Sequence, residues 1–157
     1  MLTKILRSWM MRSLAFASGL AFLCSFSGGL GGDSFKVYLG DKLLTEQYLT
    51  SKFNAPTITI QEATKNDMVK VHFNECGQIG IKRTLSLRDG SKLLKSWSFD
   101  DASANNPGAW MTIKADEIKA FQKNAALLKL VYASKHIDKG VSLVSISSQP
   151  STASVGR

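Results

Sequence analysis

Apolar and polar residues alternate along most of the chain from residue 34 onward. The alternation occurs at residues 34–39, 57–61, 69–73, 84–88, 110–114, 127–133 and 141–147. In the first of these segments Phe35, Val37 and Leu39 share one side, and Lys36 and Tyr38 share the other. A period of two is typical of a strand that buries one face. The pattern therefore predicts an all-β domain of about eight or nine short strands.

Two short segments with glycine mark tight turns between strands. Gly40-Asp41 is a two-residue turn with glycine first, and Asp89-Gly90 is a strong hairpin signal. The strand that returns from the second turn cannot keep one clean face, because Lys95 shares the phase of Trp97. We therefore expect a β-bulge near Leu93-Leu94, where one extra residue would shift the phase.

The period changes near residues 116–123, where one short helix is predicted. Ile118 and Phe121 lie three residues apart, which favours a helical face, and Asp116 is placed to cap the helix start. The elements together favour an antiparallel β-sandwich over residues 34–149. Between residues 110 and 148 the order of strand, helical corner, strand, hairpin and strand is typical of an immunoglobulin-like architecture.

The first 27 residues have the three parts of a secretory signal peptide. A basic start leads into an apolar run of about ten residues and then into small residues, and we expect cleavage after Ser27. A permanent membrane span needs about twenty apolar residues, so none is expected here. Phe22 and Leu23 are too bulky to precede a lipid-bearing cysteine, which argues against an anchor at Cys24. The chain is therefore expected to be exported, to the periplasm or beyond the cell.

Composition limits the function classes once the leader is removed. The chain has 20 basic and 12 acidic residues, and loss of the three basic residues in the leader leaves a net charge of +5. A modest, scattered surplus does not favour nucleic-acid binding. Cys76 is then the sole cysteine, so no intramolecular disulfide is possible. We expect residues 28–33 to be a flexible linker and residues 150–157 to be a disordered tail.

His72 and Cys76 are the first candidates for chemistry. They lie in a predicted strand, where four residues span about 13 Å, whereas zinc ligands approach one ion within about 2.3 Å. A shared metal would require a sharp turn at Asn74-Glu75 and a third ligand. The simpler interpretation is that His72 is a solvated strand residue and that Cys76 closes the strand as a small hydrophobe.

The loop at residues 99–108 is the second candidate. Asp101, Ser103 and Asn105 alternate as oxygen ligands do in calcium loops, but the glycine and closing acid of an EF-hand are absent. Because such residues are also common in ordinary surface turns, no calcium or other cofactor is predicted. Lys82, Arg83, Arg88, Lys92 and Lys95 surround the second hairpin and are expected to form a solvated face.

Aromatic residues are the third candidate. Tyr38, Tyr48, Trp97, Trp110 and Tyr132 could form a sugar platform, although aromatic residues in strands usually pack in the core. Trp110 follows the acceptor-rich loop, so Trp110 with Asp100 and Asp101 is the predicted partner contact. The alternative is that Trp110 folds inward and the loop is only a connection.

The run CGQIGIKRTLSLRDGSKLLKSWSFDDA, residues 76–102, resembles a stretch in small exported bacterial proteins of no assigned function. The likeness lies in Cys76-Gly77, in the strand Arg83–Asp89, in Gly90 and in the return strand Leu94–Asp101. It implies export and a β fold and carries no catalytic residue. The sequence therefore predicts an exported non-enzymatic module that binds an envelope protein, peptide or glycan or has a structural role. The alternative is a metal- or thiol-dependent enzyme that uses His72 and Cys76.

Overall fold

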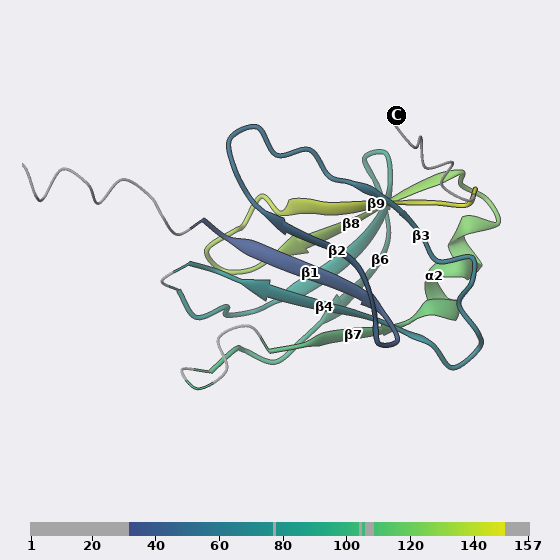
Figure 1. The fold of residues 1–157 in the computed structure, drawn as a ribbon. Helices are drawn as coiled ribbons and strands as arrows, with labels where there is room; N and C mark the ends of the chain where they lie inside the picture. The colour runs from purple at the N-terminus through teal and green to yellow at the C-terminus, as the bar shows by residue number, and fades with distance from the viewer. Residues whose placement is uncertain (1–31, 77, 104, 106–108, 150–157) are drawn as a thin grey trace, which may run out of the picture. The chain divides into compact units, whose positions relative to one another are not determined.

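The computed structural model describes residues 32–76, 78–103, 105 and 109–149, and these contain two β-sheets and one short helix (Figure 1). The predicted signal peptide, the Cys24 position, most of the linker and the tail at 150–157 lie outside the described residues. Within them the mostly-β prediction is confirmed. No helix among them is long and apolar enough to cross a membrane.

The first sheet has four strands in the order β2-β1-β4-β7. Its strands are β1 (Ser34–Leu39), β2 (Lys42–Tyr48), β4 (Met68–Asn74) and β7 (Met111–Lys114). All three neighbouring pairs are antiparallel. Residues such as Val37, Val71 and Ile113 are buried and alternate with half-buried or exposed residues, so one face of this sheet turns toward the core.

The second sheet has five strands in the order β3-β9-β8-β5-β6. Its strands are β3 (Thr57–Thr59), β5 (Thr84–Asp89), β6 (Lys92–Ser98), β8 (Leu127–Ala133) and β9 (Val141–Ser147). The prediction of a wholly antiparallel arrangement is wrong at one pair, because β3 runs parallel to β9. The segment after β2 lies along the edge of β9 and runs in the same direction as β9. The Ser145 N–H donates to the Pro56 carbonyl at 2.8 Å.

Both sheets contribute to one hydrophobic core. Val71 and Phe73 from the first sheet belong to the same buried cluster as Leu85, Leu87 and Tyr132 from the second. Alternation places these residues on the inward faces of their strands, as expected from a period of two. Two sheets that bury their faces in a shared core have the layering that a β-sandwich requires.

Both hairpin turns place glycine first, with a positive φ. The β1–β2 turn is Gly40-Asp41 with φ +58° at Gly40, and the β5–β6 turn is Gly90-Ser91 with φ +57° at Gly90. A positive φ at the first position only is typical of a type II′ turn. The second turn lies one residue later than predicted, because Asp89 still pairs with Lys92.

The predicted bulge in β6 is confirmed. Leu87 faces Lys95 and Arg88 faces Leu93, so Leu94 is the extra residue. The bulge shifts the phase of the strand between Leu93 and Lys95, and Leu94 and Trp97 both pack against the core. The bulge at Leu94 therefore explains why the apolar residues of β6 do not follow a single period of two.

The helix α2 (Ala115–Gln122) follows β7 at one end of the sheets (Figure 1). It begins one residue earlier than predicted, and the prediction that Asp116 caps it is wrong: Lys114 occupies the cap position without a side-chain bond. The chain passes from strand to helix without a loop, and the Ala115 N–H donates to the Asp67 carbonyl at 2.9 Å. Asp116 lies in the first turn, where a carboxylate still favours the helix dipole.

Glu117 joins α2 to the edge strand β6. Its carboxylate accepts hydrogen bonds from the Lys95 ammonium at 2.8 Å and from the Trp97 indole at 3.1 Å. The bond from Lys95, followed by the bond from Trp97, lowers the pKa of the Glu117 carboxyl below its ordinary value. Lys95, which interrupts the apolar face of β6 in the sequence, therefore links α2 to the five-stranded sheet.

A polar cluster lies inside the opposite end of the core. The Tyr132 hydroxyl donates to Glu75 Oε1 at 2.6 Å, and the Tyr132 ring stacks on Phe73 with centroids 4.0 Å apart. Burial first, and then the bond to Glu75, raises the pKa of Tyr132. Gly80 leaves room for this cluster, because a Cβ at that position would lie 2.8 Å from Arg83 Cδ and 3.1 Å from the Tyr132 hydroxyl oxygen.

Arg83 belongs to this buried cluster, so its predicted place on a solvated face is wrong. Its side chain is 2% exposed, and its guanidinium donates to the carbonyls of Asp100 and Ala109. The physical reason is its phase, since Arg83 precedes Leu85 and Leu87 at a spacing of two and therefore points inward with them. Backbone carbonyls satisfy the donors that burial removes from water.

The Tyr132–Glu75 bond generates a stability prediction. Tyr132→Phe removes the donor and leaves a buried carboxyl without its partner, which is expected to cost about 1–3 kcal/mol of unfolding free energy. Tyr48→Phe is the matched control, because Tyr48 is 65% exposed and its loss of a hydroxyl should stay within about 0.5 kcal/mol. Urea denaturation measures both variants. Equal stability of the two variants would contradict a structural role for the buried bond.

Candidate functional site

The outer face of the four-stranded sheet carries the most distinctive side chains. Residues that pair across strands point to the same side, so the register aligns Lys36 with His72 and aligns Tyr38 with Lys70 and Thr112. The inward residues between them are buried, which leaves this set on the opposite, outward face. The outward face therefore results from the alternation of residues within each strand and from the register between neighbouring strands.

Trp110 completes this face from the residue before β7. It is 49% exposed, and its ring centroid lies 5.4 Å from that of Tyr38 and 5.1 Å from that of His72. Trp110 therefore does not fold into the core, and its rings meet at the tilted and edge-on angles that aromatic pairs favour. We name the set of Tyr38, His72 and Trp110 the aromatic face.

A shallow cavity of about 490 Å³ lies beside the aromatic face. Its lining residues are Tyr38, Gly40, Asp41, Lys70, Trp110 and Thr112. Lys70 forms an ion pair with Asp41 at 2.9 Å, and Lys36 forms another with Glu46 at 2.9 Å on the neighbouring row. The cavity therefore combines aromatic rings with hydrogen-bonding groups whose charges are balanced in pairs.

His72 is kept uncharged by its position. Its partial burial is the main cause that lowers the pKa of the imidazole below its ordinary value, and the positive charges of Lys36 and Arg83 lower it further. A neutral imidazole offers one donor and one acceptor nitrogen. At neutral pH the aromatic face therefore carries polar contacts without a net charge from His72.

His72 and Cys76 lie in different settings. His72 sits on the outer face of β4 against Trp110, whereas Cys76 lies beyond the end of β4. Cys76 was expected to close the strand as a small hydrophobe, but it is exposed two residues beyond the end of β4. Its backbone N–H donates to the Asp33 carboxylate at 2.9 Å. His136 lies in the loop between β8 and β9. Among the residues with described positions, no three His, Cys, Asp or Glu side chains gather as metal ligands would.

The acidic residues of the 99–108 loop contact the neighbouring segment rather than a ligand cavity. The Asp101 carboxylate accepts from the Lys82 backbone N–H at 2.6 Å, and the Asp100 carbonyl accepts from Arg83. Lys82 has a φ of +53°, an uncommon value for a residue with a side chain, and the bond from Asp101 holds it there. Ser103 and Asn105, the other two calcium candidates, are exposed.

The sequence indicates Trp110 as a contact residue, and it indicates His72 only as a candidate for metal binding or catalysis rather than as a neighbour of Trp110. Tyr38 was recognised only as one of five aromatic residues, of which Trp97 and Tyr132 pack inward. Lys70, Asp41 and Thr112 were missed. These residues could have been found from their outward positions on three segments, but only if the pairing register of the strands had been known.

Comparison of the chain with protein-family models, with curated proteins and with solved structures found no match.

Proposed function

We propose that the chain is an exported, non-enzymatic binding module that recognises a neutral glycan through the aromatic face. The observation that carries this proposal is the half-exposed Trp110 ring beside a cavity lined by polar groups. This ring lies against two other aromatic rings, so the three together offer an apolar surface on which a ligand can stack. A sugar ring offers a flat apolar side for stacking and hydroxyl groups for hydrogen bonds around it.

The cavity supplies both kinds of contact. Trp110 and Tyr38 present ring surface, while Lys70, Asp41 and Thr112 present donors and acceptors at the rim. Sites of this class combine apolar surface with a few placed polar groups that fix orientation. A peptide or an envelope protein is the competing partner. Either would be recognised mainly through its main chain, whereas a glycan would be recognised by stacking of a sugar ring on Trp110.

The pairing of charges favours a neutral ligand. Lys70 and Lys36 each have a carboxylate partner within 3 Å, at Asp41 and Glu46 respectively. His72 adds no charge at neutral pH, because the pKa of its imidazole is lowered. A ligand with a formal charge would have to separate one of these ion pairs, whereas hydroxyl groups can share them.

The non-enzymatic part of the proposal rests on the positions of the two residues that favoured an enzyme. His72 packs on Trp110 on the outer face, and Cys76 follows the end of the same strand. A nucleophile and its base must lie within hydrogen-bonding reach. No bond between these two side chains occurs in the described structure.

We also propose an immunoglobulin-like topology. The order β9-β8-β5-β6 corresponds to the G-F-C-C′ sheet of such domains, and the pair β4-β7 corresponds to strands B and E. On this assignment β1 takes the place of strand A, and β2 is an additional edge strand. Domains of this class are common outside the cytoplasm, where they serve as recognition modules.

Glycan binding is testable with the residue that carries the proposal. A panel of neutral oligosaccharides (chito-, cello- and malto-hexaose among them) is expected to contain a ligand whose affinity falls at least about tenfold in Trp110→Ala, because ring burial contributes about 1.5–3 kcal/mol. Tyr48→Ala is the matched control: Tyr48 is exposed on a strand of the same sheet but does not line the cavity. Isothermal titration measures the affinities. Failure of the whole panel, or undiminished binding by Trp110→Ala, would refute the proposal.

Export is testable by the mature N-terminus. Cleavage after Ser27 predicts that protein recovered from outside the cytoplasm of a bacterial host begins at Gly28. N-terminal sequencing of that material gives the answer directly. Intact Met1 on protein retained in the cytoplasm or membrane would contradict export.

A further inference from the structure

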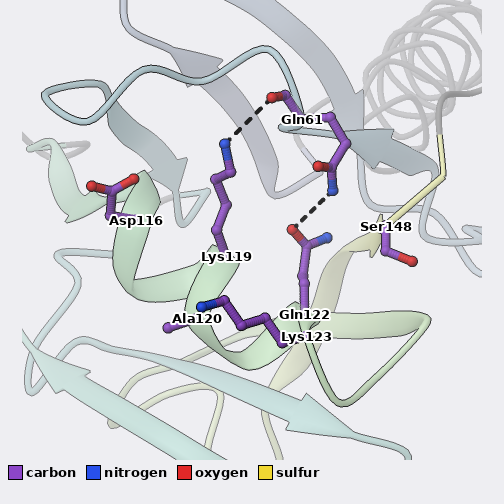
Figure 2. Close-up of a pocket in the computed structure, with 7 residues that line it drawn as sticks. All are labelled: Gln61, Asp116, Lys119, Ala120, Gln122, Lys123 and Ser148. Atoms are coloured by element: carbon purple, nitrogen blue, oxygen red, sulfur yellow. Dashed lines mark hydrogen bonds between the residues drawn. The ribbon is translucent and has the colours of Figure 1, made fainter.

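A second cavity of about 510 Å³ lies at helix α2, away from the aromatic face (Figure 2). Residues from α2, from the loop after β3 and from the end of β9 line it: Gln61, Asp116, Lys119, Ala120, Gln122, Lys123 and Ser148. All of these residues except Ala120 have polar or charged side chains, whereas two aromatic rings line the other cavity. None of these residues was singled out as a functional residue in the sequence.

Gln122 is the unusual residue of this cavity. Its side chain is 7% exposed, which is rare for glutamine, and its Oε1 accepts a hydrogen bond from Gln61 Nε2 at 3.4 Å. Its Nε2 has no hydrogen-bond partner among the described residues. Buried amide donors are nearly always paired. Almost no surface of this nitrogen is exposed, but its side chain lines the cavity, so a small rotation of the amide would present the donor to an acceptor from outside the chain.

The charges around Gln122 favour an anion. Lys119 and Lys123 are four residues apart on α2, so their stems lie on one face of the helix, where two like charges repel each other. The Lys119 ammonium donates to the Gln61 carbonyl at 3.3 Å (Figure 2). It also donates to the Ala63 carbonyl at 2.9 Å. Lys123 is exposed, and no described group accepts a hydrogen bond from it.

From this arrangement we infer that the cavity at α2 binds a small molecule with one carboxylate group. One carboxylate oxygen accepts from Gln122 Nε2, and the ammonium of Lys123 balances the charge. Asp116 lies in the lining and disfavours a ligand with two negative charges, such as a phosphate monoester. A free carboxylic acid and the C-terminus of a peptide share this chemistry. The inference is independent of glycan binding, because the two cavities share no lining residue.

Nuclear magnetic resonance can detect this contact on the full chain. Sodium acetate represents a free carboxylate, and N-acetyl-glycyl-glycine represents a peptide C-terminus. Each is titrated at constant ionic strength while the side-chain NH₂ signals of Gln122 are followed. A saturable shift of these signals is expected with at least one probe, and the tighter probe identifies the source. Acetamide, which has the same shape without the charge, should give no saturable shift.

Three variants separate a specific site from general attraction to lysine. Gln122→Glu keeps the acceptor for Gln61 and removes the free donor, so it should abolish saturation by either probe. Lys123→Ala should weaken the tighter probe at least about fivefold, whereas Lys129→Ala, at an exposed position on β8, should not. No saturable shift with either probe, or equal weakening by the two lysine variants, would overturn the inference.

Discussion

The buried guanidinium of Arg83 links the interior of the domain to its surface. It donates to the carbonyl of Asp100 and to that of Ala109, which stand near the two ends of one loop. A guanidinium cannot lose its charge inside a protein, so its donors must find acceptors when it is buried. Arg83 therefore holds Asp100 and Ala109 together, and the Lys82–Asp101 bond reinforces the first of these contacts.

This constraint connects the core with the aromatic face. The Ala109 carbonyl that Arg83 holds belongs to the residue before Trp110, so the anchor sets where the tryptophan leaves the loop. On its inner side the Arg83 stem lies beside Gly80, which also makes room for the bond between Tyr132 and Glu75. Gly80, Glu75 and Tyr132 thus surround the arginine that holds the residue before Trp110.

Local patterns predicted the elements well and their long-range partners poorly. Alternation located the strands, and the mixed phase of Lys95 and Trp97 indicated the bulge at Leu94. The parallel pairing of β3 with β9 was missed, because backbone pairing over such a distance leaves little trace in side-chain pattern. The charge of Arg83 predicts an exposed side chain, whereas its phase with Leu85 and Leu87 places it inside. In the candidate site, Trp110 was identified from its loop, but its neighbours come from other strands and depend on register.

The most direct test of this account is the mobility of Trp110 when its anchor is weakened. In a Trp9→Phe, Trp97→Phe background, the fluorescence anisotropy decay of Trp110 is compared among the parent, Arg83→Lys and Arg88→Lys. Lysine has a single head group that cannot hold both loop ends as the planar guanidinium does, so Arg83→Lys should add a fast nanosecond component. Arg88, whose bond is to Ser91 in the adjacent turn, should leave the decay unchanged when replaced by lysine. A folded Arg83→Lys variant with the parent's decay would contradict the claim that the buried arginine positions the aromatic face.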